Sequence, residues 1–137
     1  MPRKARKILR PTALAMVICD AVLRDESTKK PTLVGLFNQV TAPVFPAMHP
    51  GMHVFLSLTN GHGKQPFLLQ CKAPDDSVVF EAGGEIDLAS PLDVADLNIE
   101  LRGLVFAKEG TYIFEFFCGG ELLTMRRFSI TREKANG

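Results

Sequence analysis

Short apolar runs alternate with clusters of turn-forming residues along almost the whole chain, and this repetition limits the fold more than any other feature. From Ala13 onward the runs are rich in Val, Ile, Leu and Phe, and clusters of Gly, Pro, Asp, Asn and Lys separate them. Branched and aromatic side chains favour strands, whereas the clustered residues favour turns. The expected strands cover residues 13–23, 32–40, 53–59, 67–73, 78–81, 98–106, 111–118 and 121–130.

Between these runs the pattern leaves little room for helices. One short turn is expected at Pro91–Leu97, with Ser90 as its cap. Residues 41–51 contain three prolines, which lack an amide donor, and they are expected to form a loop or an irregular edge. Many short strands without intervening helices favour an all-β fold: an antiparallel β-sandwich of immunoglobulin-like or similar type, with a barrel as the alternative.

Length and charge set the domain organisation. A chain of 137 residues is long enough for one domain with its own core. We expect a flexible basic arm at residues 1–12, a β-sandwich domain at 13–131 and a frayed tail at 132–137. The net charge of +1 provides no overall field that would attract nucleic acid or an anionic membrane.

The cysteines indicate the compartment. Cys19, Cys71 and Cys118 lie far apart inside apolar runs, where a free thiol behaves as a small hydrophobic side chain. Secreted domains of this size tend to pair their cysteines, so an odd number favours a reducing compartment, the cytoplasm. The basic N-terminus is not expected to begin a secretory signal, because Asp20 and Arg24 interrupt the apolar run behind it. No stretch approaches the roughly 20 apolar residues of a membrane span.

The segment from Gly110 to Phe117 contains the only tyrosine of the chain and three phenylalanines. A glycine followed by Tyr112 at the start of an alternating strand is typical of the corner strand of an immunoglobulin-like sandwich, whose phenol bonds back to the upstream backbone. Strand side chains alternate, so Tyr112, Phe114 and Phe116 are expected on one face. Phe116 and Phe117 cannot both enter one core, so one of them should face outward as a patch suited to association.

Two sets of residues, one in each half of the chain, resemble those of a known family. The first set is Cys19-Asp20, Asp25, Thr28-Lys29, Leu33, Gly35, Phe37, Phe45-Pro46 and His49. The second set is Glu81, Pro91-Leu92, Leu104-Val105-Phe106, Gly110, Tyr112, Gly120-Glu121-Leu122 and Arg126-Arg127. Together they resemble a family of small bacterial all-β proteins of unknown function, over nearly everything from Ala13 to Ile130. The resemblance implies an all-β fold and a bacterial source but no activity.

No combination of residues indicates a metal site or a catalytic site. His49 lies between prolines, and close pairs such as Cys-x-x-Cys, which mark zinc sites, do not occur. There is no serine elbow and no cysteine beside a base. Asp20 interrupts an apolar strand, where it either points to solvent or is buried and paired; we expect a structural role for it, as for Gly110 and Tyr112. The chain is therefore not expected to be an enzyme or to hold a metal or cofactor.

The first ten residues carry five basic side chains and no acidic ones. Such a segment is either a solvated tail or an arm that docks on an acidic partner, a neighbouring copy or nucleic acid. Any contact with nucleic acid is expected only through this arm and without sequence specificity. The lack of aromatic residues for base stacking disfavours recognition of single strands. The rest of the chain has eleven basic and fifteen acidic residues, a net charge of −4. The basic residues of the arm are Arg3, Lys4, Arg6, Lys7 and Arg10.

Two functional hypotheses follow from these observations. The first is a non-catalytic interaction or assembly module that self-associates or docks on a partner protein, with the basic arm, Phe116 and Phe117 as interaction residues. The alternative is a small-ligand-binding β-sandwich with a pocket at the proline-rich loop. That pocket would be lined by Phe45, Met48, His49 and Met52. No membrane partner is expected.

Overall fold

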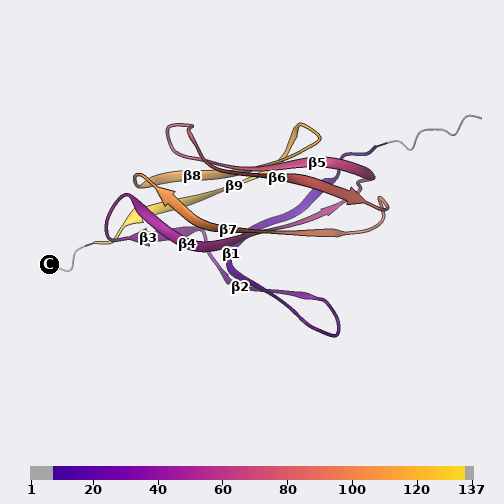
Figure 1. Cartoon of the computed structure of the whole chain (residues 1–137), viewed down its shortest axis with the longest axis horizontal. Helices are drawn as coiled ribbons and strands as arrows, with labels where there is room; N and C mark the ends of the chain where they lie inside the picture. Colours follow the sequence, from indigo (N-terminus) through magenta and orange to yellow (C-terminus); the bar gives the residue numbers. More distant parts are fainter. Residues whose placement is uncertain (1–7, 135–137) are drawn as a thin grey trace, which may run out of the picture.

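Two β-sheets packed face to face make up the fold (Figure 1). The computed structural model describes residues 8–134, whose regular structure consists of strands. The strands are β1 (Thr12–Arg24), β2 (Pro31–Leu36), β3 (Gln39–Ala42), β4 (Ala47–Thr59), β5 (Gly63–Lys72), β6 (Val78–Leu88), β7 (Ala95–Phe106), β8 (Gly110–Cys118) and β9 (Glu121–Arg132). The first sheet has the order β2-β1-β4-β7 and the second the order β3-β9-β8-β5-β6. The all-β sandwich expected from the sequence is confirmed.

The expected strand at 32–40 is divided between the two sheets. Its first part, β2, pairs with β1 in the first sheet, whereas β3 pairs in parallel with β9 in the second. The chain crosses between the sheets at Phe37 and Asn38. The Phe37 amide donates to the Ile18 carbonyl of the first sheet, and the Ser129 amide of the second donates to the Asn38 carbonyl. One run of strand-forming residues therefore serves both sheets, and the second sheet is mixed rather than purely antiparallel.

Two segments expected to be irregular or helical are instead part of the first sheet. β3 ends at Ala42 and β4 begins at Ala47, so only residues 43–46 form a loop, and the ladder to β7 passes over Pro50 without pairing it. Pro91–Leu97 forms no helix: Ser90 Oγ accepts from the Leu92 amide at 3.2 Å in a short turn, and β7 follows at once. Pairing with a neighbouring strand satisfies the backbone of both segments better than local structure does.

Alternation along the strands fills the space between the sheets. Tyr112, Phe114 and Phe116 of β8 all point inward, and none is more than 1% exposed. Phe128 of β9 stacks on Phe114 with 5.0 Å between ring centres, and Phe106 meets it edge-on. From the opposite sheet, β4 contributes the buried side chains of Met52, Val54, Leu56 and Leu58.

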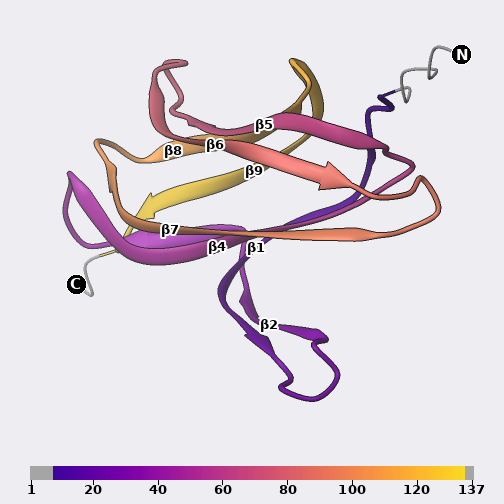
Figure 2. The same cartoon turned by 45° about the vertical axis from the view of Figure 1, so that its right-hand side comes forward.

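The β1–β2 hairpin projects from the body of the sandwich (Figure 2). β4 pairs with β1 only as far as Cys19, so beyond this residue β1 has β2 as its neighbour. At the tip, the Asp25 carboxylate accepts from the amides of Thr28 and Ser27 at 2.8 and 2.9 Å. These hydrogen bonds lower the pKa of Asp25 to about 2, and the one from the Thr28 amide has the largest effect. The hairpin is thus held by its own turn as well as by its attachment to the sheet.

Tyr112 forms the corner interaction that its position predicts. Its hydroxyl donates to the carbonyl oxygen of Lys108 at 2.6 Å, while its ring packs edge-on against Phe106. We expect Tyr112→Phe to lower the free energy of unfolding by about 0.5–1.5 kcal/mol, because the Lys108 carbonyl would lose its partner. Denaturant unfolding of the two proteins measures the difference. An unchanged unfolding midpoint would mean that this hydrogen bond does not stabilise the fold.

Candidate functional site

The outer face of the second sheet carries a row of apolar side chains. Phe116 is fully buried, so its neighbour Phe117 points away from the core. In register, Phe117 lies between Leu68 of β5 and Leu122 of β9. On the far side of Leu68 stands Gly83 of β6, which adds no side chain. We call Leu68, Phe117 and Leu122 the apolar strip.

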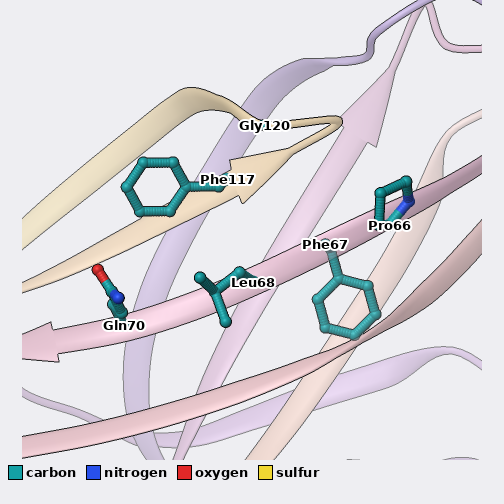
Figure 3. Close-up of a pocket in the computed structure, with 6 residues that line it drawn as sticks. All are labelled: Pro66, Phe67, Leu68, Gln70, Phe117 and Gly120. Atoms are coloured by element: carbon teal, nitrogen blue, oxygen red, sulfur yellow. The ribbon is translucent and has the colours of Figure 1, made fainter.

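A hollow of about 390 Å³ opens on the apolar strip (Figure 3). Figure 3 shows the side chains of Phe117 and Leu68 on neighbouring strands, with Gly120 in the turn that follows β8. Gln70 is the polar side chain in the lining, and its amide donates to Glu81 at 2.9 Å. The hollow is lined by Pro66, Phe67, Leu68, Gln70, Phe117 and Gly120. Such a surface can accept an apolar side chain, but it offers no group for proton or nucleophile chemistry.

Opposite charges flank the apolar strip. On one side, β6 directs Glu81, Glu85 and Asp87 to the same outer face, and all three are exposed. Lys64 pairs with Glu85 at 3.4 Å, so the group remains net negative. On the other side, β9 presents the exposed Arg127. The face is therefore acidic along β6 and carries an exposed arginine on β9, with the ion pair of Lys72 and Glu115 between them.

The described end of the basic arm lies beside the hollow. The Arg10 guanidinium forms an ion pair with Glu121 and donates to the Gly119 carbonyl at 3.0 Å. Leu9 and His62 exchange two backbone hydrogen bonds of 3.0 Å. Residues 8–11 are thus attached to the body, although the sequence led us to expect a flexible arm up to residue 12. The other basic residues of the arm, Arg3, Lys4, Arg6 and Lys7, lie outside the described residues.

The four residues expected to line a pocket at the proline-rich loop do not come together. Met52 is fully buried in the core, and Phe45 lies under the guanidinium of Arg132, which is 5.1 Å from its ring centre. Met48 and His49 do border a hollow next to the loop, but Met48 is 71% exposed. Two of the four residues thus lie together at the loop, whereas Met52 does not join them because β4 carries it between the sheets.

A second, polar hollow adjoins His49 at the base of the β1–β2 hairpin. It brings Asp20 and Gly35 of the hairpin next to Phe37 and His49. All four belong to the residues on which the family resemblance rests, although no pattern in the sequence predicted that they lie together. The expected hairpin between residues 13–23 and 32–40 could have predicted part of this arrangement, because pairing the two strands sets Asp20 opposite Gly35.

The three cysteines are free and fully buried. Burial raises the pKa of each thiol, that of Cys71 to about 12, so little nucleophilic thiolate forms near neutral pH. Residues 8–134 contain no group of three or more His, Cys, Asp or Glu side chains placed to hold a metal ion. Within the same range, no helix has the length and apolarity that crossing a membrane requires.

Comparison with known proteins agrees with the resemblance noted in the sequence. A family model described as a family of unknown function (DUF6941) matches residues 14–131. The match extends from β1 to β9 and includes both hollows. No curated protein matches the chain.

Proposed function

Since the chain belongs to the DUF6941 family of unknown function, we propose a function from its own surface: it is a non-catalytic assembly module that pairs with a second copy through the outer face of the β3-β9-β8-β5-β6 sheet. The observation that carries the proposal is the outward Phe117 in the apolar strip. An apolar row across three neighbouring strands, with a hollow beside it, has the character of an interface. A second copy supplies the same apolar side chains to fill the hollow.

The charges around the apolar strip favour a copy of the same chain as the partner. In a two-fold contact each surface must be complementary to itself. A two-fold axis parallel to the strands would place the acidic β6 of one copy over the basic β9 and arm of the other. Glu81 is in register with Met125, two residues from Arg127 on β9, so the long side chains of Glu81 and Arg127 would approach each other across the interface in both directions, with Phe117 near the axis.

The size of the face also suits a dimer. The four long strands β9, β8, β5 and β6, about 4.8 Å apart and with about nine residues at 3.3 Å each, span roughly 19 by 30 Å, or about 570 Å². Specific interfaces bury about 600–1,000 Å² on each partner. A contact over the whole of this face therefore reaches about the lower end of that range, and the apolar strip would form its dry centre.

The solution mass of the full chain tests the proposal. We expect a dimer for the natural protein and a monomer for Phe117→Lys, because the lysine would bring an unpaired charge into the apolar centre. Val105→Lys is the matched control: Val105 is 49% exposed but lies on β7 of the other sheet, and its replacement should leave the dimer intact. Sedimentation velocity over a range of concentrations measures the three masses. A natural protein that stays monomeric throughout would disprove the proposal.

Charge reversal tests the orientation of the two copies. Glu81→Lys and Arg127→Glu should each weaken the dimer, because each places like charges opposite one another. The doubly substituted protein should recover much of the loss, since the pair is restored with reversed sign. The attraction should also weaken as the salt approaches about 1 M, where the screening length falls to about 3 Å. No recovery in the double variant would rule out this orientation.

We place the module in a reducing compartment, the bacterial cytoplasm. Three free and buried thiols support this placement, because an oxidising compartment would favour paired cysteines. The bacterial source rests on the family resemblance.

A further inference from the structure

The polar hollow at the base of the β1–β2 hairpin lies apart from the apolar strip on which the proposed dimer is centred. Its volume is about 280 Å³. It forms where β1, the end of β2, the start of β3 and the beginning of β4 meet. None of its lining residues lies on β5, β6 or β8. Its properties can therefore be tested separately from self-association.

Asp20 and Gly35 create an anionic group at the edge of this hollow. The two residues lie opposite each other, because the residues on either side of them are paired in β1 and β2. A Cβ at Gly35 would collide with the Asp20 carboxylate, and the φ of +71° at this position also favours glycine. Among the described residues, no hydrogen bond or ion pair engages the Asp20 carboxylate, which is exposed. The carboxylate is thus available to a ligand.

His49 and Phe37 form the adjoining wall. Their rings are stacked, with centres 6.0 Å apart and planes inclined by 26°. Within residues 8–134, the buried Nδ1 of His49 has no hydrogen-bond partner. Burial lowers the pKa of His49, although the Asp20 carboxylate opposes the shift. The imidazole is therefore neutral at pH 7 and leaves the negative charge of Asp20 uncompensated.

We propose that this hollow binds a guanidinium or ammonium group, which pairs with Asp20 and packs against the rings of Phe37 and His49. Carboxylates and aromatic faces are the protein groups that attract organic cations most strongly. The volume is at the small end of ligand pockets and suits the end of an arginine or lysine side chain or a small amine. The nearby Arg126 does not fill this role, because its terminal nitrogens donate to Asn38 Oδ1 at 2.6 Å and to the Met16 carbonyl at 3.1 Å.

Chemical-shift titration of the full chain with n-propylguanidinium tests the proposal. We expect saturable shifts at the amides around Asp20, Gly35 and His49. The neutral and nearly isosteric n-propylurea should produce no saturable shift there. Asp20→Asn should weaken guanidinium binding by about tenfold or more, the usual effect of losing a charged hydrogen-bond partner. His49→Leu should weaken it about two- to tenfold, because it removes one of the two aromatic rings against which the cation packs.

Two further measurements make the result decisive. The control variant Asp96→Asn removes an exposed carboxylate from β7 and should leave the affinity for n-propylguanidinium unchanged. The same spectra show whether each variant is folded. Equal binding of n-propylurea, or unchanged affinity in Asp20→Asn, would overturn the proposal. A synthetic peptide of residues 1–10 distinguishes the two sources of the cation. If the peptide binds more tightly than n-propylguanidinium, with the same dependence on Asp20, the cation comes from the arm of another copy. If n-propylguanidinium binds and the peptide does not, the cation is a free small molecule. If Phe117→Lys is monomeric and still binds the probe, the site is independent of the dimer.

Discussion

Phe116→Ala should lower the free energy of unfolding by about 3–5 kcal/mol, the usual loss for a large aromatic side chain in a core. Phe116 is fully buried, and its ring stacks on that of Phe67 with 5.9 Å between centres. Phe117→Ala, one position further along β8, should lower the free energy of unfolding of the monomer by only about 1 kcal/mol or less. Phe117 faces the outer hollow, so its removal leaves no cavity between the sheets.

The contrast between these neighbouring positions separates packing from assembly. Denaturant unfolding at concentrations below the dimer dissociation constant measures the stability of each monomer, and sedimentation measures the mass. Phe117→Ala should weaken the dimer but change the free energy of unfolding of the monomer little. Phe116→Ala should lower the free energy of unfolding of the monomer itself. Similar losses of monomer stability at the two positions would contradict the assignment of Phe117 to the outer face.

Gly110→Ala should lower the free energy of unfolding by about 2–4 kcal/mol, from two separate causes. The φ of Gly110 is +146°, a backbone conformation that is unfavourable by about 1–3 kcal/mol for a residue with a side chain. A Cβ at this position would also lie 2.6 Å from Cγ of Pro74, a rigid ring that cannot turn away. Overpacking of this kind is unfavourable by about 1–3 kcal/mol.

Two comparisons separate the causes. Gly120 has a φ of +84° but nothing within 4 Å of the Cβ position, so Gly120→Ala should show the loss from backbone strain alone. Pro74→Ala removes the close Cγ, and Gly110→Ala should be less unfavourable in that background. Thermal and denaturant unfolding of the natural protein, Gly110→Ala, Pro74→Ala and the double variant completes the cycle. Equal losses in both backgrounds would mean that Pro74 plays no part.

The two surfaces give the sandwich separate capacities. The apolar strip is the surface proposed to meet a second copy, whereas the polar hollow is small and suited to one charged group. The hollow beside the apolar strip and the polar hollow share no lining residue. The proposed self-association and the proposed cation site would therefore use separate parts of the surface.

Period-two alternation made much of the fold predictable from the sequence. It is a local property of extended backbone, so it identified the strands and put Tyr112, Phe114 and Phe116 together on one face. Turn chemistry is equally local, and the corner role of Tyr112 followed from the glycine before it. The outward position of one of the two adjacent phenylalanines also needed no knowledge of the rest of the chain.

Pairing between distant strands was decided only by the tertiary structure. Leu68 and Leu122 join Phe117 because β5 and β9 lie on either side of β8, and nothing local specifies either neighbour or its register. The split of residues 32–40 between the sheets has the same origin, since the backbone at the crossover is hydrogen-bonded to Ile18 of the first sheet and to Ser129 of the second. Asp20 and His49 meet because β4 runs past the base of the hairpin. Strand choice depends on how the whole core packs, whereas the strands themselves depend on a few adjacent residues.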